Sequence, residues 1–305
     1  MGRIEKALAI ILFLTLLCFI AVLLAQSLSP ENNEEIYSVS VLVDELSDYR
    51  RMGMEKAALE NNLDVHYVSG FGKSAAQQAE YLQREIENGV DAVIVSAPDA
   101  DYLSTWLEDT HVSIPIIAIG DRPLSSTITS YVAPNNVELG RMLAEEMLLA
   151  PEGYPFLVLM EFDSSPHIKE RCEGLTTAFR EAGRTIECRY VENDPAAVAG
   201  LMAKRRATCV AVLDEALLGA LSEGCHFYDM LYGIGYTNEV RTELESQRLR
   251  SLIVYSGFEE GYISMTYAAQ ATQAPNIGDF SLHAFRVDKD NMYESPQQQI
   301  LFPIS

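Results

Sequence analysis

Basic residues are scarce in this chain of 305 residues. Lys and Arg number 22 against 44 Asp and Glu, which gives a formal net charge of −22 at pH 7. Binding to nucleic-acid phosphates needs a basic face, so this balance argues against a nucleic-acid partner. The hydrophobic content is 48%, which is enough for one large core or for two lobes.

Cysteine and histidine are also sparse, with five of each. The cysteines match no CxxC spacing, and the histidines form no HExxH pair, so we predict no metal site. Cys209 and Cys225 flank a predicted strand and helix, which is compatible with a disulfide or with two free thiols. The disulfide state of Cys172 and Cys188 is likewise open. A Ser-His-Asp order and a phosphate loop are both missing, so we predict no catalytic residue and no cofactor.

Only one long hydrophobic run occurs, from Ala7 to Ala25, and Thr15 is its one polar residue. As a helix it would be about 28 Å long, close to the ~30 Å hydrocarbon core of a bilayer. Basic residues precede the run and acidic residues follow it, which predicts a cytoplasmic N-terminus. A retained anchor is therefore expected, and cleavage after Ala25-Gln26-Ser27, with secretion, is the alternative. Cys18 lies inside the run, so lipidation is not expected.

A strand-loop-helix unit begins at Tyr37. The apolar run Val39–Val43 ends abruptly in acidic and polar residues, and a helix is expected over Arg50–Asn61. A mostly apolar run of this length is typical of a strand buried on both faces of a parallel sheet. Its polar loop lies at the carboxyl end of the strand, where open α/β sheets bind ligands.

This unit repeats along the chain. Ser74-x-x-Gln77 has the form of a capping box before a further helix that ends at Gly89. The expected strands are Leu63–Val68, Val90–Val95, Ile114–Ile119, Pro155–Met160, Thr185–Val191, Cys209–Leu213, Met230–Ile234, Leu252–Tyr255 and Leu282–Val287. Further helices are expected over Val137–Leu149, Ile168–Ala182, Asp214–Leu221, Asn238–Ser246 and Phe258–Ala271. Two series of alternating strands and helices predict an α/β protein with two doubly wound, flavodoxin-like parallel-sheet lobes.

Four segments, in this order and at these distances, carry a resemblance to a known family: IPIIAIGDRP, APNNVELG, KERCEGLTTAF and LDEALLGAL. The chain resembles type I periplasmic binding proteins of the ribose-binding kind, from about Ser38 to Val287. That resemblance implies two lobes joined by three crossovers, near Ala133–Asn136, Ser256–Phe258 and Ser281–Leu282. The related lac-repressor family carries a DNA-binding domain where this chain has its hydrophobic run, so a repressor role is not expected.

The expected domain organisation follows from both lines of reasoning. Residues 1–27 would form a cytoplasmic tip with the transmembrane anchor or signal, and residues 28–36 a tether. The N-terminal lobe would comprise residues 37–133 with 257–281. The C-terminal lobe would comprise residues 134–256 with 282–305.

The resemblance also implies a ligand site in the cleft between the lobes. The family's contact positions map onto Asp48, Tyr49 and Arg50 in the first loop, Asp121 and Arg122 after the fourth strand, and Lys169 and Asp214 in the second series. Three other family positions are occupied by Leu213, Gly235 and Tyr255, which depart from the sugar-binding pattern. We include Tyr236, Asn238 and Tyr255 as ligand-binding candidates, and we expect a ligand other than free ribose.

Two functions are compatible with these features. The first is an extracytoplasmic receptor that delivers a small, polar, carbohydrate-like ligand to an ABC permease. The second is a membrane-tethered sensor that reports ligand occupancy to a histidine kinase or a similar signalling partner. An enzyme on this fold is a remote third alternative.

Overall fold

The fold is described from a computed structural model. It describes residues 2, 15–17, 19–20, 36–44, 46–161, 165–192, 194, 196, 198, 200, 208–224, 230–274 and 276–302. The chain divides into two compact units, Met1–Ile36 and Tyr37–Ser305. Within the described residues no helix is long and apolar enough to span a membrane. Most of the predicted span Ala7–Ala25 lies outside the described residues, as does Cys225.

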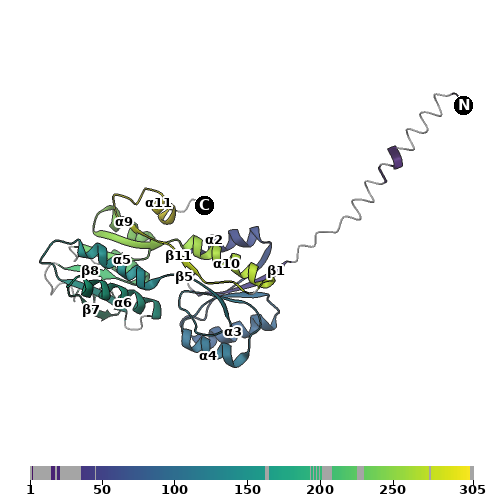
Figure 1. The fold of residues 1–305 in the computed structure, drawn as a ribbon, viewed down its shortest axis with the longest axis horizontal. Coiled ribbons are helices and arrows are strands. Elements are labelled where there is room, and N and C mark those ends of the chain that lie inside the picture. Colours follow the sequence, from purple (N-terminus) through teal and green to yellow (C-terminus); the bar gives the residue numbers. More distant parts are fainter. Residues whose placement is uncertain are drawn as a thin grey trace. The chain divides into compact units, whose positions relative to one another are not determined.

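Two six-stranded sheets form the second unit (Figure 1). The strands of the first sheet, in spatial order, are β11 (Phe280–Leu282), β5 (Ile128–Pro134), β4 (Ile116–Ile119), β3 (Ala92–Ser96), β1 (Tyr37–Leu42) and β2 (Leu63–Val68). Those of the second are β12 (Ala284–Val287), β10 (Leu249–Tyr255), β9 (Met230–Ile234), β8 (Cys209–Val212), β6 (Phe156–Glu161) and β7 (Glu187–Val191). All neighbouring strands are parallel except β10 and β12.

Helices cover both faces of each sheet, as the doubly wound prediction requires (Figure 1). On the first sheet, α2 (Asp48–Glu60) and α10 (Gly257–Gln273) contribute to one core, and α3 (Ala75–Glu87) and α4 (Ala100–Thr110) to the other. On the second sheet, α5 (Asn136–Leu148) and α6 (Pro166–Glu181) line one core. The opposite core includes α8 (Glu215–Gly224), α9 (Asn238–Glu245) and α11 (Gln297–Leu301). We call each sheet with its helices a lobe.

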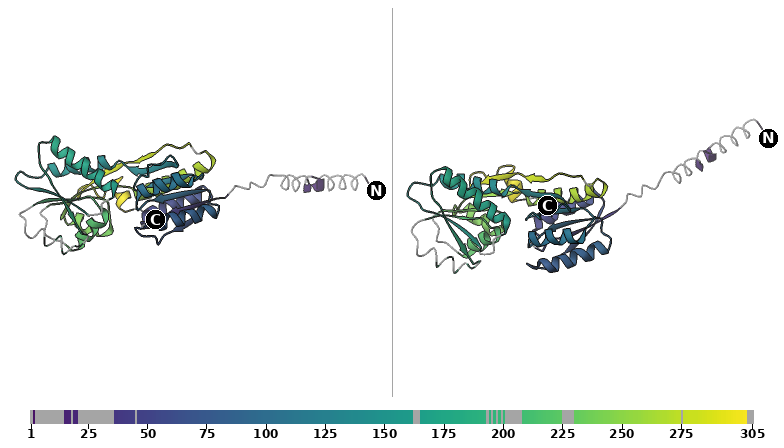
Figure 2. Two further views of the ribbon diagram at one scale, coloured as in Figure 1. Left: turned by 90° about the horizontal axis from the view of Figure 1, so that it is seen from below. Right: turned by 60° about the horizontal axis from the view of Figure 1, so that its bottom comes forward.

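Three segments carry the chain between the lobes. The first follows β5, the second joins β10 to α10, and the third joins β11 to β12. The third lies within the yellow segment that runs across both lobes in Figure 2. The single strand expected over Leu282–Val287 was wrong, because Leu282 pairs with Pro134 in the first sheet and Ala284 pairs with Tyr255 in the second. The two-lobe α/β fold itself is confirmed. The exact division at residues 133, 256 and 281 stays a prediction.

Glycines allow the helices next to these crossings to pack closely. A Cβ atom on Gly261 of α10 would lie 2.0 Å from the backbone oxygen of Arg50 in α2. In the second lobe, a Cβ atom on Gly174 of α6 would lie 1.9 Å from the backbone oxygen of Val137 in α5. Since real Cβ atoms do not approach backbone oxygens so closely, each helix pair depends on a missing side chain. In both lobes, therefore, a glycine allows two helices to pack with their backbones in contact.

Polar caps fix the helix ends that face the space between the lobes. Ser47 accepts a hydrogen bond from Arg50 N at the start of α2, and Ser256 accepts one from Glu259 N at the start of α10. Asn135 caps α5 in the same manner through Glu138 N. These caps satisfy backbone N–H groups that would otherwise have no partner in the first helical turn. They also set the direction in which the following side chains project.

Candidate functional site

A cavity of about 1390 Å³ lies where the carboxyl ends of both sheets meet. Its walls are the loops after β1, β3 and β4 in the first lobe and after β6, β8 and β9 in the second. In each sheet the strand order reverses at the first strand of the lobe, β1 or β6, which is where α/β folds bind their ligands. The volume exceeds the ~300–1,000 Å³ typical of small-molecule pockets, so a small ligand and water fit together.

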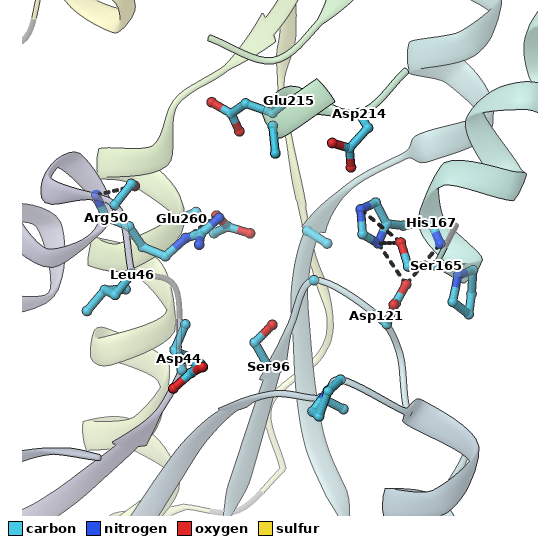
Figure 3. A pocket seen from close by; sticks show the side chains of 18 of the residues that line it. Asp44, Leu46, Arg50, Ser96, Asp121, Ser165, His167, Asp214, Glu215 and Glu260 are labelled. Carbon is cyan, nitrogen blue, oxygen red and sulfur yellow. Dashed lines mark hydrogen bonds and ion pairs between the residues drawn. The ribbon is translucent and has the colours of Figure 1, made fainter. Parts of the chain in front are cut away.

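Arg50 and Glu260 form a buried ion pair on one wall of this cavity (Figure 3). Arg50 Nε donates to Glu260 Oε2 at 2.7 Å, and Arg50 Nη2 lies 2.6 Å from the same oxygen. The side chains are 20% and 1% exposed. Burial lowers the pKa of the Arg50 guanidinium, but the charge of Glu260, its hydrogen bond and the nearby Tyr255 and Glu215 together outweigh burial, so the pKa is raised. The arginine is therefore fixed as a cation, with its charge already balanced.

Arg171 occupies the corresponding place in the second lobe. Each arginine stands three residues before a glycine in the helix that follows the first strand of its sheet, Gly53 in α2 after β1 and Gly174 in α6 after β6. Arg171 Nε donates to Asn136 Oδ1 at 3.1 Å, and Nη1 donates to the Leu213 carbonyl at 2.8 Å. The residue is 5% exposed, so these neutral acceptors hold a buried cation at the cavity wall.

Asp121 joins the two lobes across the cavity (Figure 3). It follows β4 in the first lobe, is 6% exposed, and accepts a hydrogen bond from the backbone N of His167 at 2.9 Å. His167 Nδ1 lies 2.8 Å from the same carboxylate oxygen and 2.8 Å from Ser165 Oγ. His167 and Ser165 both stand at the start of α6 in the second lobe. In this structure Asp121 therefore holds the lobes together directly.

Three more carboxylates among the described residues face the cavity and lie outside its ion pairs. Asp214 Oδ1 accepts a hydrogen bond from Leu217 N at 2.9 Å, and Glu215 Oε1 accepts one from Tyr236 N at 3.0 Å. Asp44 accepts a hydrogen bond from the backbone N of Gly70. Among the described residues none of these three carboxylates takes part in an ion pair within 4.0 Å. One oxygen of each stays available for a ligand.

Aromatic and hydroxyl groups complete the lining. Tyr49, Phe71, Tyr236 and Tyr255 contribute rings, and burial followed by the charge of Glu260 raises the pKa of the Tyr255 hydroxyl. Thr237 Oγ1 is buried and makes no hydrogen bond within the described part of the chain. A buried hydroxyl with no protein partner is a natural contact for a ligand hydroxyl, because an unmade hydrogen bond costs about 1–3 kcal/mol.

Eight of the ten predicted site residues line this cavity: Asp48, Tyr49, Arg50, Asp121, Lys169, Asp214, Tyr236 and Tyr255. Arg122 does not, because its guanidinium pairs with Asp279 at 2.7 Å and lies over the Tyr131 ring. Asn238 begins α9, and its side chain lies outside the described residues. Ligand contact by the eight stays a prediction.

Sequence reasoning missed four important groups. Glu215 and Arg171 stand one and two residues beyond predicted positions, so the local pattern already contained them. His167 lies at the predicted boundary between a loop and a helix, a position at which its ring was a possible site residue. Glu260 gave no signal, because its partner Arg50 is 210 residues away in the chain.

A model of the family described as "Periplasmic binding protein domain" matches residues 38–275. This chain belongs to that family. Over 149 residues it is 28% identical to the ribose import binding protein RbsB of Bacillus subtilis (strain 168), a match that covers 46% of this chain and 48% of the relative. The matched region therefore spans about half the length of that relative.

Solved structures share the fold. The carbohydrate transporter solute-binding protein of Agrobacterium radiobacter, in complex with D-arabinose, superimposes with a TM-score of 0.78 over 88% of this chain and 99% of that one, at 15% identity. A solute-binding protein of Agrobacterium vitis, bound with α-D-tagatopyranose, gives a TM-score of 0.73 over 87% and 99% of the two chains, at 17% identity. At these identities the likeness shows the fold alone.

Proposed function

We propose that this periplasmic binding protein holds a small polar ligand of the carbohydrate class between its lobes, outside the cytoplasm, and delivers it to an ABC importer. One observation carries the proposal. Carboxylates, hydroxyls and aromatic rings from both lobes line one cavity, and Asp121 of the first lobe accepts a hydrogen bond from His167 N of the second lobe. Carbohydrates offer many hydroxyl donors and an apolar face, which this set of groups suits. The relatives with bound D-arabinose and tagatopyranose support the same ligand class.

A ligand that contacts both lobes favours their closed arrangement, because a ligand shifts an equilibrium by its difference in affinity for the two states. At a concentration 100-fold above its dissociation constant it adds about 2.7 kcal/mol to the free energy of unfolding. For a domain of 150–250 residues, at about 2–4 °C per kcal/mol, the melting temperature then rises by several degrees.

The test is a thermal-shift screen of the purified protein against neutral sugars, amino sugars, sugar acids and polyols. A hit should lose most of its shift in Asp121→Ala, which removes the group that bridges the lobes. Asp109→Ala is the matched control, because Asp109 is exposed on α4 and is not part of the cavity lining. If no compound of any class changes the melting temperature, the proposal fails.

The same binding event could instead inform a histidine kinase, but no observation on the described residues favours this sensor over transport. We also propose that the hydrophobic run Ala7–Ala25 attaches the protein to the membrane, with Met1 in the cytoplasm. Mass spectrometry of the membrane fraction should then detect peptides that contain Gly2. A mature protein that begins near Leu28 in the soluble fraction would show that the run is a cleaved signal.

A further inference from the structure

The cavity is strongly acidic. Among the residues that the structure describes, nine carboxylate side chains and four lysine or arginine side chains line it. The acidic character of the whole chain explains carboxylates on its outer surface, where water screens them. It does not explain carboxylates in a space that loses water when the lobes close on a ligand, because an unpaired charge in such a place is costly.

Two of the four cations are already engaged. Arg50 is paired with Glu260, and Arg171 is held by Asn136 and the Leu213 carbonyl. The other two, Lys73 and Lys169, are exposed residues. The protein therefore keeps its two buried cations occupied and leaves carboxylates available.

Asp44, Asp214 and Glu215 are those available carboxylates. Figure 3 shows Asp214 and Glu215 on one side of the cavity and Asp44 on the opposite side, so carboxylates of both lobes face it. Each accepts one backbone N–H, and none has an ion-pair partner among the described residues. Water reaches Glu215 from the cavity, yet desolvation raises the pKa of its carboxyl by more than the Tyr236 N–H and the charges of Arg50 and Arg171 lower it. A positive charge placed between these groups would relieve that cost.

We infer that the ligand carries a protonated amine, as an amino sugar does. The inference rests on the proposed function and narrows its ligand class. The amine nitrogen donates to the available oxygens of Asp214 and Glu215, and the hydroxyls of the same ligand are bound by the remaining polar groups. A neutral sugar would satisfy hydrogen bonds but would leave the excess negative charge enclosed.

The experiment is isothermal titration calorimetry on the full chain with matched pairs of ligands. D-glucosamine is compared with D-glucose, and D-galactosamine with D-galactose, at a pH at which the amine is protonated. Putrescine is included as a cation without hydroxyls. We expect an amino sugar to bind at least tenfold more tightly than its parent, and its affinity to fall as sodium chloride is raised.

The decisive variant is Glu215→Gln, which removes the charge and keeps an oxygen that can accept from Tyr236 N. It should weaken the amino sugar at least tenfold, and by a larger factor than it weakens the parent sugar. Glu87→Gln makes the same substitution at an exposed position outside the cavity and should change neither.

Each result has a separate meaning. If the neutral parents bind as tightly as the amino sugars, the inference is overturned and the proposed carbohydrate receptor stands. If putrescine binds as tightly as the amino sugars, the inference of a cation is supported and the carbohydrate class is overturned. If no sugar and no amine binds, both fail. The comparison of ligands on the unmodified protein decides these cases even if a variant does not fold.

Discussion

Gly261→Ala places a methyl group in the tight contact between α10 and α2. The new Cβ atom would lie 2.0 Å from the backbone oxygen of Arg50 and 3.1 Å from the backbone N of Met54. No flexible side chain can yield, since both neighbours are backbone atoms. The two helices must move apart, and with them the buried pair of Arg50 and Glu260.

Two opposing effects set the size of the change. Alanine favours a helix over glycine by about 1 kcal/mol. Overpacking a core costs typically about 1–3 kcal/mol, and occasionally more, and a contact this short with rigid backbone belongs at or above the upper end. We therefore expect a net loss of about 2 kcal/mol in the free energy of unfolding. At about 2–4 °C per kcal/mol this lowers the melting temperature by about 4–8 °C.

Thermal unfolding followed by circular dichroism measures this directly. Gly257→Ala is the matched control in the same helix, because the nearest atom to its new Cβ would be Ser47 Oγ at 3.8 Å, an ordinary contact. The control should melt at the parent temperature or slightly above it. If Gly261→Ala is as stable as Gly257→Ala, the helices are not packed as closely as the structure has them, and the reasoning is refuted.

Three further predictions concern other parts of the molecule. In the reduced protein, a hydrogen bond with the facing thiol of Cys172 lowers the pKa of Cys188 to about 7. Iodoacetamide should therefore alkylate Cys188 faster than Cys172, at a rate that rises through pH 7, and equal rates for the two thiols would contradict this. Glu260→Ala leaves Arg50 without its partner and should cost about 1–3 kcal/mol by urea unfolding, whereas the additional change Arg50→Met should recover part of that loss. Phe179→Ala empties a fully buried position and should cost about 3–5 kcal/mol, a prediction that a loss below about 1 kcal/mol would refute.

Most strand and helix positions could be predicted from the sequence. A strand buried on both faces of a sheet requires an apolar run, and the helices between such strands begin at capping residues. Val39, Val41 and Leu42 are fully or almost fully buried in β1, and Ser74 caps α3 as its sequence motif predicts. Boundaries were less readable where polar residues lie inside a strand. The structure begins β10 at Leu249, three residues before the predicted start at Leu252. The prediction began too late because Arg250 is exposed and Ser251 donates a hydrogen bond to the Val287 carbonyl, so neither residue has the apolar side chain that marks a buried strand.

The location of the site was also predictable, and the partners of its charges were not. A parallel sheet places every loop after a strand at one edge, and the family resemblance assigned Asp121 and Asp214 on two such loops to the cleft. Arg122 stands next to Asp121 in the chain, yet it pairs with Asp279 outside the cavity. Adjacent residues point in different directions, and only the fold decides what each one meets.

The sequence by itself determined the alternation of strands and helices, the two-lobe class and the acidic charge of the protein. These properties follow from local periodicity and composition, which each segment carries alone. The tertiary structure decided that Glu260 balances Arg50 across 210 residues and that Asp121 reaches His167 in the other lobe. It also decided that Asp44 and Glu215 form no ion pair within the described part of the chain. Such pairings depend on distances of a few ångströms between segments far apart in the chain, and electrostatic attraction and desolvation change steeply over those distances.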